Sequence, residues 1–281
     1  MHRISPAFDA PDCVLRLEAA TAAPSLCVLV GNADAWPRSA RTYDSEHRVP
    51  CTVNSMRLVV HETPGDAAEA VARRIVNLIA AADDIFTLGL AGGSTPEATY
   101  RSLRERDVPW AKVEAWLTDE RWVPPDHARS NGNMVSTALL DHVDATFHRP
   151  PWSELIEPSD SAAQYEATIR SIHDQRRPDL VLLGMGEDGH TASLFPDTSA
   201  LMEESRWIVA NHVPQLDETR LTATYPLLWS ARTVMVLVSG DNKAEALKKT
   251  LEGDTPAGRL TEGEGEVEWH IDRAAASLIS S

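Results

Sequence analysis

The sequence predicts an α/β fold that is doubly wound, with a mostly parallel sheet and helices on both faces. Two observations carry this prediction. From Met56 onward, short apolar runs alternate with helical patterns, which is typical of parallel strands covered by helices. A chain of 281 residues that is 43% hydrophobic is also long enough to build one sizeable core. The expected strands are 85–91, 113–120, 179–185, 207–213 and 233–240.

The first 55 residues differ in composition from the rest of the chain. They hold scattered Pro, Ala, Ser and Asp and one apolar cluster, Leu26–Val30. We interpret residues 1–55 as an irregular, poorly ordered N-terminal extension and residues 56–281 as the folded domain. The domain opens with a β-branched strand, a turn at Pro64 and an amphipathic helix that we expect to be capped near Asp66.

Further helices are expected near 95–106, 161–177 and 241–252, and a last strand at 267–271 precedes a terminal helix. Ligands of open parallel sheets bind beyond the carboxyl ends of the strands. The residues that follow each strand are therefore the candidates for a functional site.

Charge and cysteine content exclude several classes of protein. A formal net charge of −16 argues against a nucleic-acid or anionic-membrane partner, because both require clustered Lys and Arg. No apolar run reaches the roughly 18 to 20 residues of a membrane span, and no signal segment is evident, so we expect a cytoplasmic protein. The three cysteines, all within the first 51 residues, indicate neither a disulfide framework nor a zinc site.

The first candidate segment is Gly92-Gly93-Ser94-Thr95-Pro96, which follows strand 85–91 and precedes a helix. Glycines let the backbone approach an anion, and a helix amino end offers N–H groups and partial positive charge. The segment thus suits a phosphate group. The alternative is an ordinary glycine turn followed by a helix-capping hydroxyl. The Walker lysine and the GxGxxG spacing are absent, so neither a nucleoside triphosphate nor a dinucleotide is indicated.

The second candidate segment is Asp119-Glu120-Arg121, followed by Ser130-Asn131-Gly132-Asn133. Two carboxylates and a guanidinium at a strand end suit proton transfer and anion binding. A run of exposed surface charges would give the same pattern.

The third candidate segment is GEDGHTASLFP, which starts at Gly186 directly after strand 179–185. Its glycines predict a tight turn around Asp188 and His190. Imidazole accepts a proton from water near neutral pH, and a neighbouring carboxylate can fix its tautomer. The alternative is a histidine with a purely structural role.

Two cations complete the set. Arg220 follows strand 207–213, and Lys243 starts the helix after strand 233–240. Each could be a solvated surface charge, although a lysine in the first turn of a helix is disfavoured by the helix dipole. Together with the glycine-rich turn and the histidine, they describe a pocket for a phosphorylated small molecule.

These motifs occur in a recognisable order: AGGSTPEATY, TDERWVP with SNGN, GEDGHTASLFP, RLTATYPLL, SGDNKAEAL and WHIDRAAASL. In that order they resemble the 6-phosphogluconolactonase family, within the glucosamine-6-phosphate isomerase/deaminase superfamily with its Rossmann-like fold. The resemblance covers about Met56 to Ile279 and implies a catalytic domain over 56–281. Deaminases continue Asp-Gly-His with Ile-Ala-Phe-Asn-Glu-Pro, and they have Tyr where this chain has Arg121. Both positions favour the lactonases.

The resemblance implies hydrolysis of 6-phospho-D-glucono-1,5-lactone to 6-phosphogluconate in the oxidative pentose phosphate pathway, with no metal and no cofactor. His190 would act as the base, oriented by Asp188, and Asp119 would belong to the same catalytic group. Arg121 or backbone N–H groups near the glycines would stabilise the oxyanion. The implied phosphate-binding residues are Gly92, Gly93, Ser94, Thr191, Arg220 and Lys243, and the implied further substrate contacts are Asn131 and Gly186.

The implied partner is a phosphorylated sugar lactone, and we expect a monomer or weak homo-oligomer. Three alternatives stay open at this point. The chain could be a sugar-phosphate isomerase or deaminase on the same scaffold, or a non-catalytic sugar-phosphate sensor. It could also be a serine hydrolase that uses Ser94 or Ser193.

Overall fold

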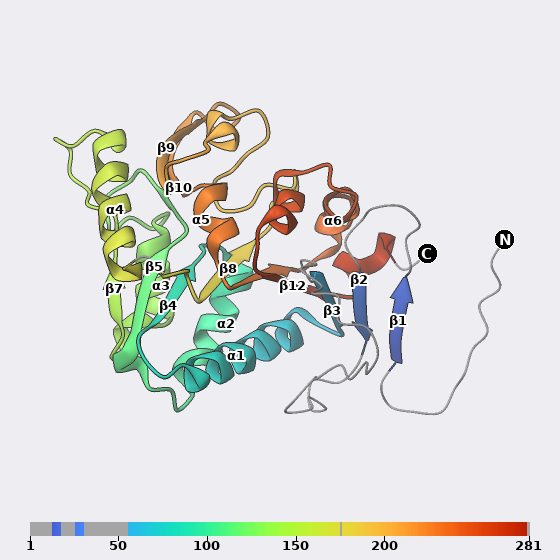
Figure 1. The fold of residues 1–281 in the computed structure, drawn as a ribbon. Coiled ribbons are helices and arrows are strands. Elements are labelled where there is room, and N and C mark those ends of the chain that lie inside the picture. The colour runs from blue at the N-terminus through green and yellow to red at the C-terminus, as the bar shows by residue number, and fades with distance from the viewer. Residues whose placement is uncertain (1–12, 18–25, 31–55, 175, 280–281) are drawn as a thin grey trace, which may run out of the picture.

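The structure is a computed structural model that describes residues 13–17, 26–30, 56–174 and 176–279. Within these ranges, nine strands form one sheet, and all neighbouring strands run parallel except β1 and β2 (Figure 1). The expected mostly parallel sheet is confirmed. In sheet order the strands are β1 (Cys13–Leu17), β2 (Leu26–Val30), β3 (Met56–His61), β12 (Glu266–Asp272), β11 (Thr233–Val238), β8 (Leu180–Gly184), β4 (Phe86–Leu90), β5 (Val113–Leu117) and β7 (Thr146–His148).

Helices cover both faces of the sheet, as expected of a doubly wound fold. Figure 1 shows α1 and α2 on one face and α5 and α6 on the other. The α-helices are α1 (Pro64–Ala81), α2 (Ser94–Arg104), α3 (Asn131–Ala138), α4 (Pro158–His173), α5 (Tyr225–Ser230) and α6 (Ala244–Leu251). The short 3-10 helices are η1 (Trp110–Lys112), η2 (Leu140–His142), η3 (Ser199–Met202), η4 (Asp241–Lys243), η5 (Pro256–Glu262) and η6 (Ala275–Leu278).

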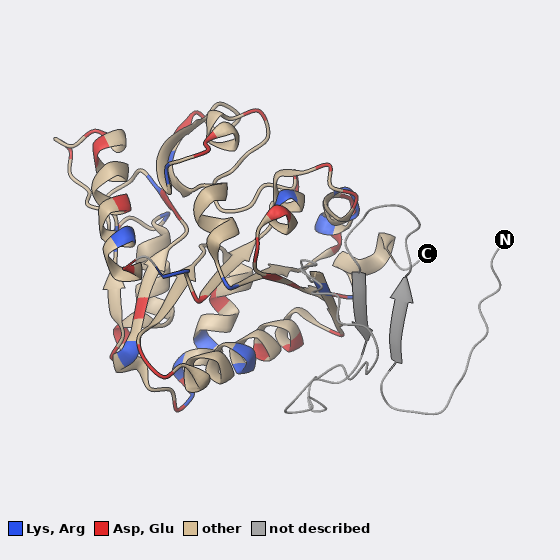
Figure 2. Ribbon diagram, viewed as in Figure 1, with Lys and Arg blue, Asp and Glu red and all other residues tan. Residues whose placement is uncertain are grey.

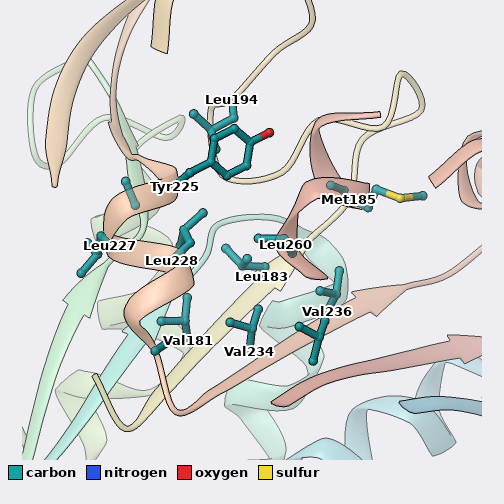
Figure 3. Packing of buried hydrophobic residues seen from close by; sticks show 14 of the residues in the cluster. Val181, Leu183, Met185, Leu194, Tyr225, Leu227, Leu228, Val234, Val236 and Leu260 are labelled. Carbon is teal, nitrogen blue, oxygen red and sulfur yellow. The ribbon is translucent and has the colours of Figure 1, made fainter. Parts of the chain in front are cut away.

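The central strands are buried on both faces because alternate side chains point into two separate cores. In β8, Val181 and Leu183 pack into one core with α4, α5 and α6, whereas Leu180 and Leu182 pack into the other with α1, α2 and α3. Figure 3 shows the first core, in which β8, β11 and α5 meet Leu260 of η5. This packing fixes the places where β4, β8 and β11 end.

The strand order changes direction between β4 and β8. These strands are neighbours, but the chain leaves β4 toward β5 on one side and leaves β8 toward β11 on the other. Such a switch point leaves a crevice beyond the carboxyl ends of the two strands. The glycine-rich turn after β4 and the GEDGH segment after β8 therefore come together.

A second, three-stranded antiparallel sheet overturns two strand predictions within the described residues. It comprises β6 (Asp119–Arg121), β10 (Glu218–Ala223) and β9 (Ile208–Val213). The expected strand 207–213 therefore lies outside the parallel sheet, because it pairs with the hairpin strand β10. The expected single strand 113–120 divides at Thr118, whose N–H donates to the Leu90 carbonyl of the main sheet while its own carbonyl accepts from Ala223.

The helix boundaries differ in smaller ways. The expected cap near Asp66 is confirmed. The N-cap of α1 is Thr63, and Asp66 completes a capping box, since each side chain of this pair accepts from the backbone N–H of the other. Figure 2 shows charges of both signs along α1. The expected terminal helix is the short 3-10 helix η6.

The N-terminal extension is only partly described. Strand β2 runs parallel to β3, and β1 pairs with β2 at the edge of the main sheet. The rest of residues 1–55 lies outside the described residues, so the expected irregular extension stays a prediction.

Candidate functional site

A cleft opens at the switch point between β4 and β8, with an empty volume of about 790 Å³ that includes its open mouth. Most of the residues expected at the site line it, although they come from segments far apart in the sequence. The expected residues that line the cleft are Gly92, Gly93, Ser94, Asp119, Arg121, Asn131, Gly186, His190, Arg220 and Lys243.

The turn after β4 is built for close approach of a ligand. Gly93 has φ +107°, in the left-handed region that favours glycine. A Cβ at Gly92 would lie 1.9 Å from Oδ1 of Asn131, so only glycine fits there. Gly93 is the N-cap of α2 and offers no side-chain acceptor, which leaves first-turn N–H groups at Ser94 without a side-chain cap. The alternative of a hydroxyl-capped helix start is therefore wrong, and the turn suits an anion.

Two arginines face each other across the small sheet. Arg121 of β6 and Arg220 of β10 are direct cross-strand partners, and both line the cleft. Like charges placed opposite each other on a sheet are destabilising unless an anion is bound between them. Arg220 lies within β10 and is only 8% exposed, so it is not the solvated loop charge considered from the sequence. Its burial lowers the pKa of the guanidinium, and the charge of Asp119 opposes that effect.

Each guanidinium is partly held in place. Nη1 of Arg121 donates to the carbonyl of Arg129 at 2.7 Å, and Nη2 of Arg220 donates to Glu218 at 3.2 Å. Arg220 also lies over the ring of Phe195, 5.4 Å from its centroid. Among the described residues, neither Nε atom has a hydrogen-bond partner. Both side chains thus keep donor capacity for a ligand.

Asp119 is buried and its carboxylate is already occupied. Oδ2 accepts from the hydroxyl of Ser193 at 2.7 Å, and Oδ1 accepts from the side-chain amide of Asn131 at 3.2 Å. The same amide donates to the Asp119 carbonyl at 2.9 Å. Asp119 therefore supplies a fixed negative charge near Arg220 and holds Asn131 at the wall of the cleft.

The neighbouring Glu120 has a structural role. Its carboxylate accepts hydrogen bonds from the first residues of α3. Burial raises the pKa of this carboxyl, although four hydrogen bonds oppose that effect. The donors are the backbone N–H groups of Arg121, Asn131 and Gly132 and the hydroxyl of Ser130. Within the motif Asp119-Glu120-Arg121, Glu120 thus stabilises the fold, whereas Asp119 and Arg121 line the cleft.

The histidine turn after β8 brings Asp188 and His190 together. Nδ1 of His190 lies 2.5 Å from Oδ1 of Asp188, and the backbone N–H of His190 donates to the same oxygen at 3.1 Å. Partial burial of Asp188 opposes its ionisation, but the hydrogen bonds from His190 outweigh it and hold the pKa of the carboxyl below its usual value. The imidazole stacks on Phe195, with ring centroids 3.9 Å apart.

Gly186 makes this pairing possible. A Cβ at Gly186 would lie 2.1 Å from Nδ1 of His190 and 2.6 Å from Oδ1 of Asp188. Since Nδ1 is engaged by Asp188, Nε2 of His190 is the nitrogen left for a reaction, and it has no hydrogen-bond partner among the described residues.

Thr191 is placed differently from the other expected phosphate contacts. Its side chain is fully buried, and its hydroxyl donates to the Gly184 carbonyl at 2.9 Å. It does not line the cleft, and its expected contact with the phosphate stays a prediction.

Sequence reasoning missed Phe195 and Ser239, and it considered Ser193 only as a possible nucleophile. Ser193 holds Asp119, Phe195 stacks on His190, and Ser239 lines the cleft with a buried hydroxyl that has no partner among the described residues. All three stand in the motifs GEDGHTASLFP and SGDNKAEAL, but the motifs alone do not say which side chains face the cleft. No serine–histidine hydrogen bond links Ser94 or Ser193 to His190 in the described chain, which argues against a serine hydrolase.

Other classes of site find no support among the described residues. They include no group of three or more His, Cys, Asp or Glu side chains placed to bind a metal. In the same ranges, no helix is both long and apolar enough to span a bilayer. The expectation that the reaction needs no metal stays a prediction.

Comparison with known proteins relates this chain to one family. The family of glucosamine-6-phosphate isomerases and 6-phosphogluconolactonase matches residues 62–269. The 6-phosphogluconolactonase of Nostoc sp. is 38% identical over 207 residues, which cover 69% of this chain and 85% of that protein. The human 6-phosphogluconolactonase is 35% identical over 232 residues, covering 76% and 88% of the two chains.

Solved structures of both activities share the fold. The 6-phosphogluconolactonase from Trypanosoma brucei superimposes with a TM-score of 0.70 at 28% identity, covering 79% of this chain and 98% of that one. A monomeric glucosamine-6-phosphate deaminase gives a TM-score of 0.69 at 26% identity, covering 79% and 99%. The backbone alone therefore does not separate the two activities.

Proposed function

The chain belongs to the glucosamine-6-phosphate isomerase/6-phosphogluconolactonase family, and from this membership we infer that it is a lactone hydrolase. Its reaction is the hydrolysis of 6-phospho-D-glucono-1,5-lactone to 6-phosphogluconate, within the pentose phosphate pathway. The curated relatives quoted above support the lactonase activity. The deaminase pattern lacks two residues of this chain, Arg121 after Asp-Glu and Thr191 after Asp-Gly-His.

The observation that supports the mechanism best is that His190 lines a cleft that also contains Arg121, Arg220 and Lys243, while Asp188, which does not line it, holds Nδ1 of His190 from behind. Asp188 accepts a hydrogen bond from the N–H group at Nδ1 and so fixes the tautomer in which Nε2 carries a lone pair. A nitrogen in that state is a general base for water. We assign His190 as the catalytic base and Asp188 as the residue that orients it.

The reaction then needs one proton transfer in each direction. Nε2 of His190 takes a proton from a water molecule while the water oxygen bonds to the lactone carbonyl carbon, giving a tetrahedral oxyanion. When the oxyanion collapses, the bond from that carbon to the ring oxygen breaks. The imidazolium returns the proton to the ring oxygen, which becomes the free hydroxyl of the open-chain acid.

We assign the cations of the cleft to two groups of the substrate, although Arg220 and Arg121 are cross-strand neighbours. Ser94 at the start of α2, Arg220 and Lys243 form the phosphate end, where the N–H groups of Gly92 and Gly93 add donors. Arg121, or backbone N–H groups of the histidine turn, stabilise the oxyanion. Holding the remote phosphate keeps the carbonyl in register with the water, so that binding energy lowers the barrier to the reaction.

Asp119 acts in this scheme through its neighbours. Its carboxylate is engaged by Ser193 and Asn131, so it balances the charge of Arg220 and fixes Asn131 as a substrate contact. Gly186 contributes by leaving room for the Asp188–His190 pair.

The proposal is tested by following acid release from freshly generated lactone in a pH-stat, with the spontaneous hydrolysis subtracted. We expect turnover well above background and unchanged by a chelator. Ammonia release from glucosamine 6-phosphate at a comparable rate would instead identify a deaminase. Ligand-dependent thermal stabilisation without turnover of either substrate would identify a sensor. The cytoplasmic location, the lack of a nucleic-acid partner and a monomeric or weakly oligomeric state stay predictions.

A further inference from the structure

The turn that carries the proposed base is short and partly open to solvent. Its own backbone closes it through two hydrogen bonds, from Gly186 N–H to the His190 carbonyl at 2.8 Å and from Gly189 N–H to the Gly186 carbonyl at 3.2 Å. The side chain of Asp188 is 43% exposed and that of His190 is 25% exposed. A turn of this kind needs outside contacts to hold an imidazole in one orientation.

The outside contact on Gly189 comes from the start of η5, far along the chain. The N–H of Ala257 donates to the Gly189 carbonyl at 2.9 Å. Gly189 has φ +77°, and a Cβ there would lie 2.5 Å from Cβ and 2.6 Å from Cγ2 of Thr255. The side chain of Thr255 therefore occupies the space beside Gly189 and fixes how closely the turn approaches η5.

Thr255 is itself fixed by Thr250 at the end of α6. Their hydroxyl oxygens lie 2.7 Å apart, and both side chains are buried. The Thr250 hydroxyl also contacts Sδ of Met185 at 3.4 Å and donates to the Ala246 carbonyl at 2.7 Å. Met185 directly precedes the turn and lines the cleft. The pair of threonines thus contacts the histidine turn at both of its ends.

The segment that holds Thr255 is anchored in the core. Ala257 and Leu260 are 0% and 1% exposed, and the hydroxyl of Tyr225 donates to the Pro256 carbonyl at 2.9 Å. Figure 3 shows Leu260 packed near Leu183 of β8, in the same cluster as Met185. The threonine pair therefore connects the exposed turn to a part of the fold that has little freedom to move.

We propose that Thr255, oriented by Thr250, is a positioning residue that sets the orientation of the Asp188–His190 pair toward the lactone carbonyl. This inference rests on the proposed base role of His190. Thr255 and Thr250 do not line the cleft, so they act on the substrate only through the turn. Misplacement of a catalytic group by a fraction of an ångström lowers the rate of the chemical step while leaving phosphate binding intact.

The experiment compares Thr255→Ala with a matched control, Thr87→Val. Thr87 is equally a buried threonine, and its hydroxyl donates to Asp179 at 3.1 Å, but it lies at the amino end of β4, away from the cleft. We expect Thr255→Ala to lower kcat about tenfold with KM within about twofold of the wild type. Thr87→Val is expected to lower the thermal midpoint while leaving kcat unchanged.

A double-mutant cycle separates this inference from the proposed function. In a His190→Ala background, Thr255→Ala should change the residual rate by less than about twofold, because the residue acts through a side chain that is gone. If His190→Ala alone retains normal turnover, the base assignment fails whatever Thr255 does. If Thr255→Ala retains its full effect without His190, the positioning role is wrong while the base assignment stands.

Thr255→Ser keeps the hydroxyl that bonds Thr250 and removes only the methyl group beside Gly189. It carries the test if the alanine variant does not fold. We expect it to lower kcat about threefold with KM unchanged. A kcat equal to that of the wild type in the folded variant, or a rise in KM that matches the fall in kcat, would overturn the proposal.

Discussion

The Asp188→Asn substitution tests the pairing that fixes the tautomer of His190. The side chain keeps its size, but the 2.5 Å contact from Oδ1 to Nδ1 loses its negative charge. A hydrogen bond to a charged group contributes about 1.5 to 3 kcal/mol, and the 43% exposure of Asp188 places this bond near the lower value. A loss of about 1.5 kcal/mol corresponds to roughly tenfold in rate.

A second effect adds to the first. The amide group can donate to Nδ1, which moves the imidazole proton to Nε2 and removes the lone pair that accepts a proton from water. We therefore expect kcat to fall about 10- to 100-fold, with KM within about twofold.

The assay is acid release from the lactone, corrected for spontaneous hydrolysis, at a series of pH values. The matched control is Asp217→Asn in the β9–β10 turn, where φ is +50° and asparagine is tolerated. It removes the same charge away from the cleft and should leave kcat unchanged. An Asp188→Asn enzyme with wild-type kcat would refute the orienting role.

Three further predictions follow from the same structure. Arg220→Ala removes a buried cation from the phosphate end, so KM should rise about 10- to 100-fold with a smaller change in kcat. The control is Arg101→Ala on the exposed side of α2, which should leave KM and kcat unchanged. If the two variants changed KM equally, Arg220 would not be a phosphate-binding residue. Gly186→Ala places a Cβ 2.1 Å from Nδ1 of His190, so kcat should fall about 100-fold in steady-state assays. Normal turnover would show that the turn accepts a side chain at this position without separating Asp188 from His190. Burial lowers the pKa of His61 in the folded protein from 6.5 to about 4. Between pH 6.5 and pH 4, the unfolded chain therefore binds a proton at His61 that the folded protein does not bind. The free energy of unfolding should then fall by up to about 3 kcal/mol as the pH drops from 6.5 to 4, and an equally steep fall in His61→Gln would exclude this source.

Much of the fold could be predicted because the main sheet has a local signature. The apolar runs that became β4, β8 and β11 alternate with helical segments, and the glycine-rich turns mark where those strands end. The pocket followed from that topology, since residues after adjacent parallel strands meet at one edge. This is why Ser94, His190 and Lys243 line the same cleft although they lie far apart in sequence.

The small antiparallel sheet had no such signature. The strand β9 looks like any other apolar run, and only its pairing with β10 and β6 removes it from the main sheet. That pairing also buries Arg220 opposite Arg121, which a local pattern of charges does not reveal. The roles of Ser193 and Thr255 were equally hidden, because each acts through a contact with a segment distant in the sequence.

The central claim is that the free nitrogen of His190 takes a proton from the water that attacks the lactone. Its most direct measurement is the kcat of His190→Ala on freshly generated lactone, with spontaneous hydrolysis subtracted and with His212→Ala, exposed on β9, as the control. The account predicts a fall of roughly 10² to 10⁴ in kcat with little change in KM for His190→Ala alone. Near-normal turnover in that variant would contradict it.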